Sequence, residues 1–404
     1  FATFNEDQAK YIHLAFAIFL AFFLFPATKK SSKTSASLLD IVLAVSASST
    51  CLYLLIFHDD LASRMGAPTA IDVTVAVVGM VTLLEATRRT LGPPLVIVAV
   101  VFLTFTFAGQ YMPEVIAHKG SSLRKVASHQ WLTTEGVFGV AIGVSTAFVF
   151  LFVLLGSLLD KAGAGNYLIK VSFSLLGHMR GGPAKAAVVA SGLSGIISGS
   201  SIANVVTTGT FTIPLMKRVG FPGTKAGAIE VAASTNGQLT PPIMGAAAFL
   251  MVEYVGIPYI EVIKHAILPS IISYIALVYI VHLEALKLNM KGIEIINKPT
   301  LSMRMLSWLS TSVILLVLGF LVYYGANFLE LVLGGAAYFA LLLIIVAAYF
   351  ALIKLSAAYP DLEDDEDSIA LDKLPETKPT VYSGLYFSLP IVVLMWALAV
   401  KQYS

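Results

Sequence analysis

The sequence has little charge and a single cysteine. Asp, Glu, Lys and Arg make up 12% of its 404 residues and hydrophobic types 57%, whereas soluble domains carry about 25% and roughly 45–50%. This composition excludes an ordinary soluble domain and indicates a protein that lies in a bilayer. The lone Cys51 has no partner for a disulfide within the chain. The net charge is +2, with Lys and Arg spread among loops, so we expect no nucleic-acid partner.

The sequence also lacks the motifs of soluble enzymes. Its seven histidines include no pair at the i, i+4 spacing of zinc sites. The glycine-rich stretch 177–185 lacks the spacing of a phosphate-binding loop. Ser194 stands one glycine out of register for a nucleophile elbow. We therefore expect no enzyme, no catalytic residue and no ATP hydrolysis, so any uphill transport must draw on an ion gradient.

Apolar stretches of the roughly 20 residues needed to cross a bilayer recur along the chain. They predict an all-α polytopic protein surrounded by membrane lipid, with about ten transmembrane helices at 11–27, 37–57, 70–86, 91–112, 134–159, 225–255, 258–284, 305–325, 329–356 and 383–401. The segment 184–216 is different, because its first arm of 14 residues reaches about 21 Å into a hydrocarbon core roughly 30 Å thick. We predict a re-entrant helical hairpin with its tip at 198–201.

The distribution of Lys and Arg tests this layout, because cytoplasmic loops carry an excess of them. With the hairpin counted as no crossing, one side receives nineteen of the 26 and the other seven. The side with nineteen is assigned to the cytoplasm. The hairpin then opens from the cytoplasm and the broken helix 225–255 runs outward. Their polar interruptions are thus able to meet near the midplane.

These interruptions are two hydroxyl-rich, glycine-broken segments, Ser191-Gly-Leu-Ser-Gly-Ile-Ile-Ser-Gly-Ser-Ser-Ile-Ala-Asn204 and Ser234-Thr-Asn-Gly-Gln-Leu-Thr-Pro-Pro242. Irregular backbone at membrane depth is tolerated where it lines a cavity or a solute path. Secondary transporters use broken helices to offer free carbonyl groups to a substrate and its coupling ion. Oxygen ligands of this kind suit a hard cation, so we predict a Na⁺ site. Its candidate ligands are Ser198, Gly199, Ser200, Ser201, Asn204, Thr235, Asn236, Gly237, Gln238 and Thr240.

Two alternatives stay open within these segments. Gly195 and Gly199 form a small-xxx-small pair that often serves close helix packing alone. Glu230 precedes the second break, where it either helps to shape the ion site or makes a structural hydrogen bond. Glu85 is adequately explained by pairing with Arg88 and Arg89 at helical spacing.

Four regions organise the chain. Residues 1–112 are predicted to form a four-helix domain like a small permease subunit, and 113–133 a periplasmic connector. Residues 134–284 hold the hairpin 184–216 and the broken helix 225–255. Residues 285–404 add further spans, an acidic cytoplasmic linker at 360–367 and the start of a second repeat.

The residues Gly181-Gly-Pro-Ala-Lys185 and onward to Lys217, followed by 233–249, closely resemble the tripartite ATP-independent periplasmic (TRAP) transporters. Glu85-Ala-Thr-Arg-Arg89 and the four-span start extend the similarity over most of residues 10–285. The resemblance implies a fused small and large permease subunit of elevator type. It also implies a sodium site at the hairpin tip and broken helix, and substrate delivery by a periplasmic binding protein of TAXI type. A bacterial or archaeal cytoplasmic (inner) membrane is the expected location.

The chain departs from that family in two respects. Asn236 stands where a second small residue, commonly Gly, is expected, and no second polar pair follows residue 285. The chain therefore looks like an incomplete permease. We expect a sodium-coupled importer of a small organic anion such as a dicarboxylate, 2-oxo acid or acidic amino acid. A sodium/carboxylate symporter that needs no binding protein and a non-transporting membrane scaffold subunit are the alternatives.

Overall fold

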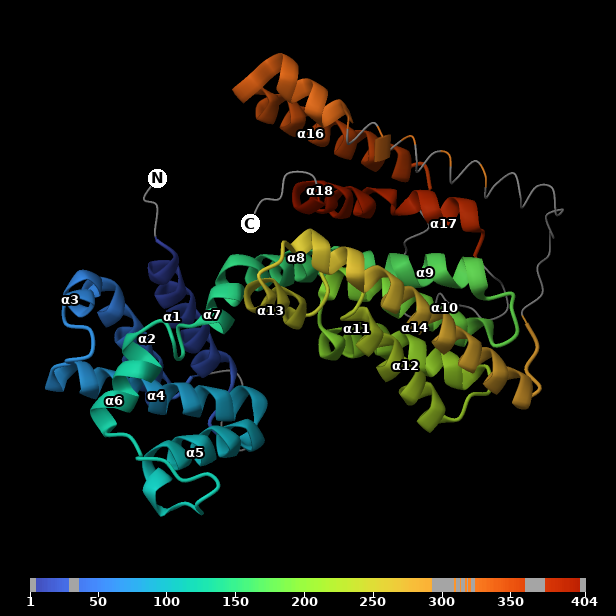
Figure 1. Ribbon diagram of the computed structural model, residues 1–404. Helices are drawn as coiled ribbons and strands as arrows, with labels where there is room; N and C mark the ends of the chain where they lie inside the picture. Colours follow the sequence, from blue (N-terminus) through green and yellow to red (C-terminus); the bar gives the residue numbers. More distant parts are fainter. Residues whose placement is uncertain are drawn as a thin grey trace. The chain divides into compact units, whose positions relative to one another are not determined.

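A computed structural model describes residues 5–28, 36–292, 324–359 and 375–399, together with 309, 313, 317, 319 and 320. The described part of the chain is helical and contains no strand, which confirms the predicted all-α class. It divides into two compact units, Phe1–Val149 and Phe150–Ser404 (Figure 1).

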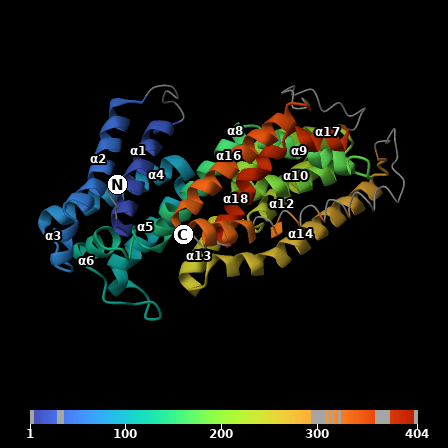
Figure 2. The same ribbon diagram turned by 90° about the horizontal axis from the view of Figure 1, so that it is seen from above.

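The first unit packs three long helices side by side, with α1 along α2 and α4 against both (Figures 1 and 2). Asn5, Ser37 and Thr69 begin these helices, and each closes a capping box that satisfies two backbone N–H groups. The elements are α1 (Glu6–Leu24), α2 (Leu38–Ile56), α3 (His58–Ser63), α4 (Ala70–Leu91), α5 (Pro93–Ala108), η1 (Gly109–Tyr111), α6 (Leu123–Ala127), η2 (Ser128–Leu132), α7 (Val140–Val144) and η3 (Ser145–Val149).

A buried arginine ties the helix ends of this unit together. Arg89 on α4 is 2.6 Å from Asp40 at the start of α2 and 2.9 Å from Glu85. Its guanidinium carbon lies 4.8 Å from the centroid of the Phe22 ring on α1. Glu85 also pairs with Arg88 at 2.7 Å, so the predicted structural role of this carboxylate is confirmed.

The second unit is a bundle in which α10 contacts α9, α11, α12 and α14 (Figure 1). Ala184, Val188, Met216 and Ala233 belong to its buried apolar core. The elements are α8 (Phe150–Lys161), α9 (Ala164–Leu176), α10 (Gly182–Ser198), α11 (Ser201–Arg218), α12 (Gly223–Gly237), α13 (Ala246–Val255), α14 (Tyr259–Lys287), η4 (Gly334–Ala336), α16 (Ala337–Ser356), α17 (Thr377–Ser383), η5 (Leu385–Phe387) and α18 (Ser388–Ala399).

Seven helices among the described residues are long and apolar enough to cross a membrane. They are Glu6–Leu24, Leu38–Ile56, Ala70–Leu91, Pro93–Tyr111, Val140–Lys161, Tyr259–Lys287 and Tyr324–Ser356, and each overlaps a predicted span. The predicted span 305–325 falls largely outside the described residues, as does the acidic linker 360–367. The count of ten crossings stays a prediction.

Helix α9 was not predicted. The ten spans left residues 160–183 without a helix, whereas α9 occupies Ala164–Leu176 and packs along α10. Its 13 residues are fewer than the roughly 20 that cross a bilayer. A search for apolar stretches of spanning length therefore passes over a short helix that packs against the hairpin.

Two packed helices and an interrupted helix lie in the segments 184–216 and 225–255. Helices α10 and α11 pack against each other and are joined at Gly199 and Ser200, within the predicted tip 198–201. The predicted broken helix is interrupted between α12, which ends at Gly237, and α13, which begins at Ala246. The re-entrant course of the hairpin through a membrane stays a prediction.

Cysteine labelling tests that course. Arg180 and Lys217 flank the hairpin and are exposed. Arg180→Cys and Lys217→Cys, each in a Cys51→Ala background, should both react with a membrane-impermeant thiol reagent applied from the cytoplasm. The exposed Lys119 of the connector, replaced by Cys, is the control that should react from the opposite side. Reaction of the first two positions from opposite sides would show that the hairpin crosses the membrane.

Candidate cation site between the hairpin and the broken helix

Two glycines let the hairpin and the broken helix touch backbone to backbone. A Cβ added to Gly195 on α10 would lie 2.5 Å from the Cα atom of Gly237 on α12. At the hairpin tip, Gly199 has a φ of +60°, and an added Cβ would lie 2.5 Å from the carbonyl oxygen of Met244. Small residues permit this close approach of helices. Packing is therefore an observed role of both glycines, and it places the tip against the break.

A buried carboxylate lies close to this crossing. Glu230 on α12 has no exposed surface. Its Oε1 atom is 2.5 Å from the hydroxyl of Thr208, and its Oε2 atom is 2.6 Å from the hydroxyl of Thr212. The hydroxyls of Ser191 and Ser234 both lie 3.3 Å from Oε1. The carboxylate thus joins both arms of the hairpin to the first half of the broken helix.

Asn204 on α11 extends this cluster toward Gly237. Its Nδ2 donates to the carbonyl oxygen of Ser191 at 2.8 Å and to the Ser191 hydroxyl at 2.9 Å. A Cβ added to Gly237 would lie 3.7 Å from that nitrogen. The Oδ1 atom of Asn204 is buried and has no hydrogen-bond partner among the described residues. The side chain therefore holds a desolvated oxygen without a donor, on the same amide whose nitrogen lies beside Gly237.

The predicted ligands in the hairpin differ in role and in burial. The Ser200 hydroxyl accepts a hydrogen bond from the Ala203 N–H at 3.3 Å and so caps α11. The Ser198 hydroxyl reaches the Ser200 carbonyl oxygen at 3.5 Å. Gly199 and Ser201 are half-buried. Among the five predicted hairpin ligands, Asn204 alone is fully buried.

The predicted ligands in the broken helix are less open than expected. The carbonyl oxygens of Thr235, Asn236 and Gly237 accept N–H groups from three residues further on at 3.0–3.1 Å. The Gln238 carbonyl accepts the Gly245 N–H at 2.8 Å. The expectation of carbonyls free of backbone hydrogen bonds is wrong here, because the helix tightens into 3₁₀-type turns before it stops. The Asn236 carbonyl oxygen also accepts the Thr240 hydroxyl at 3.0 Å. The other three carbonyl oxygens each accept one of these N–H groups and keep a second lone pair.

Side chains in this segment point in different directions. Thr235 is exposed, and its hydroxyl donates to the Val231 carbonyl oxygen at 2.7 Å. Thr240 is half-buried, with its hydroxyl 3.0 Å from the Asn236 carbonyl oxygen and 3.2 Å from the Ser270 hydroxyl on α14. The structure therefore brings Thr240 toward α14 and leaves the side chain of Thr235 away from the cluster.

Helix α14 braces the break through its hydroxyl groups. The Tyr259 hydroxyl lies 2.7 Å from the Pro242 carbonyl oxygen. The Tyr274 hydroxyl donates to the Ala233 carbonyl oxygen at 3.1 Å. Nearer the base of the hairpin, the buried Lys185 donates to Nδ1 of His282 at 3.0 Å. These contacts position the first half of the broken helix, the interruption and the base of the hairpin against one long helix.

Four hydroxyls around Glu230 were not predicted as site residues: Ser191, Thr208, Thr212 and Ser234. The spacing of polar residues along the sequence could have indicated this cluster. Asn204, Thr208 and Thr212 recur every four residues on α11, as do Glu230 and Ser234 on α12. Such spacing places side chains on one helix face, and a polar face on an otherwise apolar helix indicates a buried contact.

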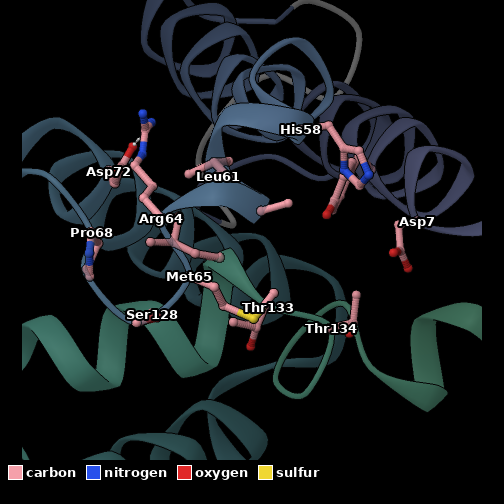
Figure 3. A pocket seen from close by; sticks show the side chains of 14 residues that line it. Asp7, His58, Leu61, Arg64, Met65, Pro68, Asp72, Ser128, Thr133 and Thr134 are labelled. Carbon is pink, nitrogen blue, oxygen red and sulfur yellow. Dashed lines mark hydrogen bonds and ion pairs between the residues drawn. The ribbon is translucent and has the colours of Figure 1, made fainter.

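The first unit holds a separate small pocket of about 210 Å³. Figure 3 shows Arg64 beside Asp72 on one side of it and His58 on another. Arg64 and Asp72 pair at 2.9 Å. Ligand pockets usually measure about 300–1,000 Å³. The pocket is therefore too small for a typical organic ligand and is no candidate for the substrate site.

The sequence of this chain is similar to those of membrane transport proteins. Residues 78–367 match the family described as "Tripartite ATP-independent periplasmic transporter, DctM component". The chain is 40% identical over 91 residues to the C4-dicarboxylate TRAP transporter large permease protein DctM of Pseudomonas aeruginosa, covering 22% of this chain and 21% of that protein. It is 27% identical over 172 residues to the protein of the same description in Vibrio cholerae, covering 42% and 35%.

A relative described as transporting a different substrate also matches. The chain is 30% identical over 95 residues to the ectoine TRAP transporter large permease protein TeaC of Halomonas elongata, covering 24% of this chain and 22% of that protein. The matched segments span about a fifth to a third of the length of the curated relatives.

The glycine crossing gives a stability prediction. Gly195→Ala should destabilise the complete gene product by about 1–3 kcal/mol, because overpacking forces the backbones apart. Gly227→Ala on α12 is the matched control, since nothing lies within 4 Å of its added Cβ. Helix propensity predicts that the control gains about 0.5–1 kcal/mol. Thermal unfolding of the purified protein measures both, and an unchanged midpoint for Gly195→Ala would contradict the close crossing.

Proposed function

The chain belongs to the DctM component family of the tripartite ATP-independent periplasmic transporters, and we propose that it forms the permease part of a sodium-coupled importer. Members of this family are transporters rather than enzymes. In this proposal Na⁺ binds between the hairpin tip and the broken helix. Downhill movement of the ion supplies the free energy for uptake.

The observation that carries the sodium site is the buried Oδ1 atom of Asn204, which no donor among the described residues satisfies. A desolvated acceptor without a partner costs about 1–3 kcal/mol. Asn204 belongs to the ligand set predicted from the sequence, and Gly237 of the same set lies beside its amide. A hard cation with oxygen ligands satisfies such an atom, and the surrounding hydroxyl and carbonyl oxygens supply further ligands.

The substrate in this proposal is a small organic anion. Relatives are described by C4-dicarboxylate, ectoine and 2,3-diketo-L-gulonate transport, which favours a dicarboxylate, 2-oxo acid or acidic amino acid here. A periplasmic binding protein of TAXI type delivers it to a fused small and large permease in a bacterial inner membrane. The bundle of the second unit then moves as an elevator. Uptake that proceeds without an added soluble binding protein would favour the simpler symporter instead.

A sodium titration tests the site. Asn204→Ala should raise the Na⁺ concentration that half-saturates thermal stabilisation of the complete gene product by roughly tenfold or more, because a lost buried oxygen contact costs about 1–3 kcal/mol. Thr210→Ala is the control on α11, since Thr210 is exposed and its hydroxyl bonds to the Thr207 carbonyl oxygen. A folded Asn204→Ala protein with the sodium response of the wild type would refute the site. No sodium response in the wild type would favour a scaffold.

A further inference from the structure

Glu230 is a buried carboxylate that makes no ion pair with any Lys, Arg or His in the part of the chain that the structure describes. The nearest basic residue in its own helix, Lys225, pairs with Glu284 on α14 instead. An isolated buried charge is expensive and is normally paired or bound to a metal ion. Ionisable groups inside membrane segments are accordingly functional candidates.

A chain of hydrogen bonds leads from this carboxylate to the Asn204 amide. The Ser191 hydroxyl accepts from Asn204 Nδ2 at 2.9 Å. It then passes its own hydrogen toward Glu230, either directly across 3.3 Å or through the Ser234 hydroxyl, which lies 2.9 Å away and itself reaches Glu230 at 3.3 Å. Each hydroxyl has one proton to donate. All donors in the chain therefore point toward the carboxylate.

This direction determines which end of the Asn204 amide is left without a partner. Both Nδ2 hydrogens are used on Ser191, one on its hydroxyl and one on its carbonyl oxygen at 2.8 Å. The reversed amide would place two acceptor oxygens, Oδ1 and the Ser191 carbonyl, against each other. Oδ1 is thereby left as the free acceptor, and it cannot rotate to find a donor without breaking two hydrogen bonds.

We propose that Glu230 is the counter-charge of the cation that Asn204 Oδ1 binds, and a positioning residue that acts on Asn204 through Ser191. This inference rests on the sodium site of the proposed function. Neutral oxygens alone leave a bound Na⁺ uncompensated in a low-dielectric interior. One buried carboxylate and one monovalent cation together carry no net charge. The cation then also removes the cost of the unpaired carboxylate.

A purely structural carboxylate would behave differently from a counter-charge. If Glu230 serves Thr208 and Thr212 alone, its replacement by Gln lowers stability equally with and without sodium. A counter-charge predicts effects of opposite sign. Without sodium, Glu230→Gln removes an unpaired buried charge and raises the unfolding midpoint. With sodium, the ion-dependent increase becomes smaller, because the ion has lost its partner.

The experiment measures unfolding midpoints of the complete gene product against Na⁺ concentration, with K⁺ keeping the ionic strength constant. Glu230→Gln should raise the half-saturating Na⁺ concentration roughly tenfold, which corresponds to about 1.4 kcal/mol, and should raise the sodium-free midpoint. Ser191→Ala keeps the charge of Glu230 but interrupts the hydrogen bonds that link it to Asn204. This variant should also weaken sodium binding. Glu284→Gln removes a carboxylate that takes no part in these hydrogen bonds and should leave the sodium response unchanged.

The outcomes separate this inference from the function on which it rests. If Asn204→Ala weakens sodium binding and Glu230→Gln keeps the affinity of the wild type, Glu230 is not the counter-charge. The sodium site is then still supported. Wild-type affinity in both variants overturns the sodium site itself. If Glu230→Gln does not fold, Ser191→Ala still tests the positioning role of Glu230. An unchanged sodium response in that variant overturns the positioning role.

Discussion

The need to satisfy polar groups inside an apolar bundle controls the arrangement of the second unit. Glu230, Ser191 and Asn204 have no exposed surface, so each of their polar atoms depends on a neighbour from another helix. The backbone contact at Gly195 and Gly237 brings those helices close enough for side chains this short to meet. A larger residue at either glycine would separate the helices and leave the polar atoms without partners.

The remaining contacts of the unit hold this crossing in place. Helix α14 reaches the first half of the broken helix through Tyr274 to the Ala233 carbonyl, and the interruption through Tyr259 to the Pro242 carbonyl. Hydrogen bonds of this kind inside a low-dielectric interior gain strength and specify one arrangement. The site is thus supported from outside by a single long helix.

Local sequence signals predicted the position of the two breaks. Glycine and proline punctuate a helix wherever they stand, so the tip at Gly199 and the interruption before Pro241 and Pro242 could be located without knowing their neighbours. Helices with strong apolar character, such as 38–56 and 259–287, were located for the same reason. The short α9 was not, because packing against α10 rather than length makes it a helix.

The identity of the polar cluster depended on three helices meeting, which spacing along one helix does not reveal. Glu230 was noted as a residue beside the break, but its contacts with Thr208 and Thr212 come from the second arm of the hairpin. Thr235 was predicted as a ligand, yet α12 continues to Gly237 and its turn places that side chain on the exposed face. Packing fixes the rotation of each helix about its own axis. This rotation determines which hydroxyls converge.

Equilibrium binding of radioactive sodium to the purified complete gene product, in the presence of excess K⁺, measures whether the protein holds this ion. Saturable binding that unlabelled Na⁺ displaces and K⁺ does not is the predicted result. The absence of saturable sodium binding by a folded protein would contradict the account, because the buried oxygen of Asn204 and the carboxylate of Glu230 would then have no cation to satisfy them.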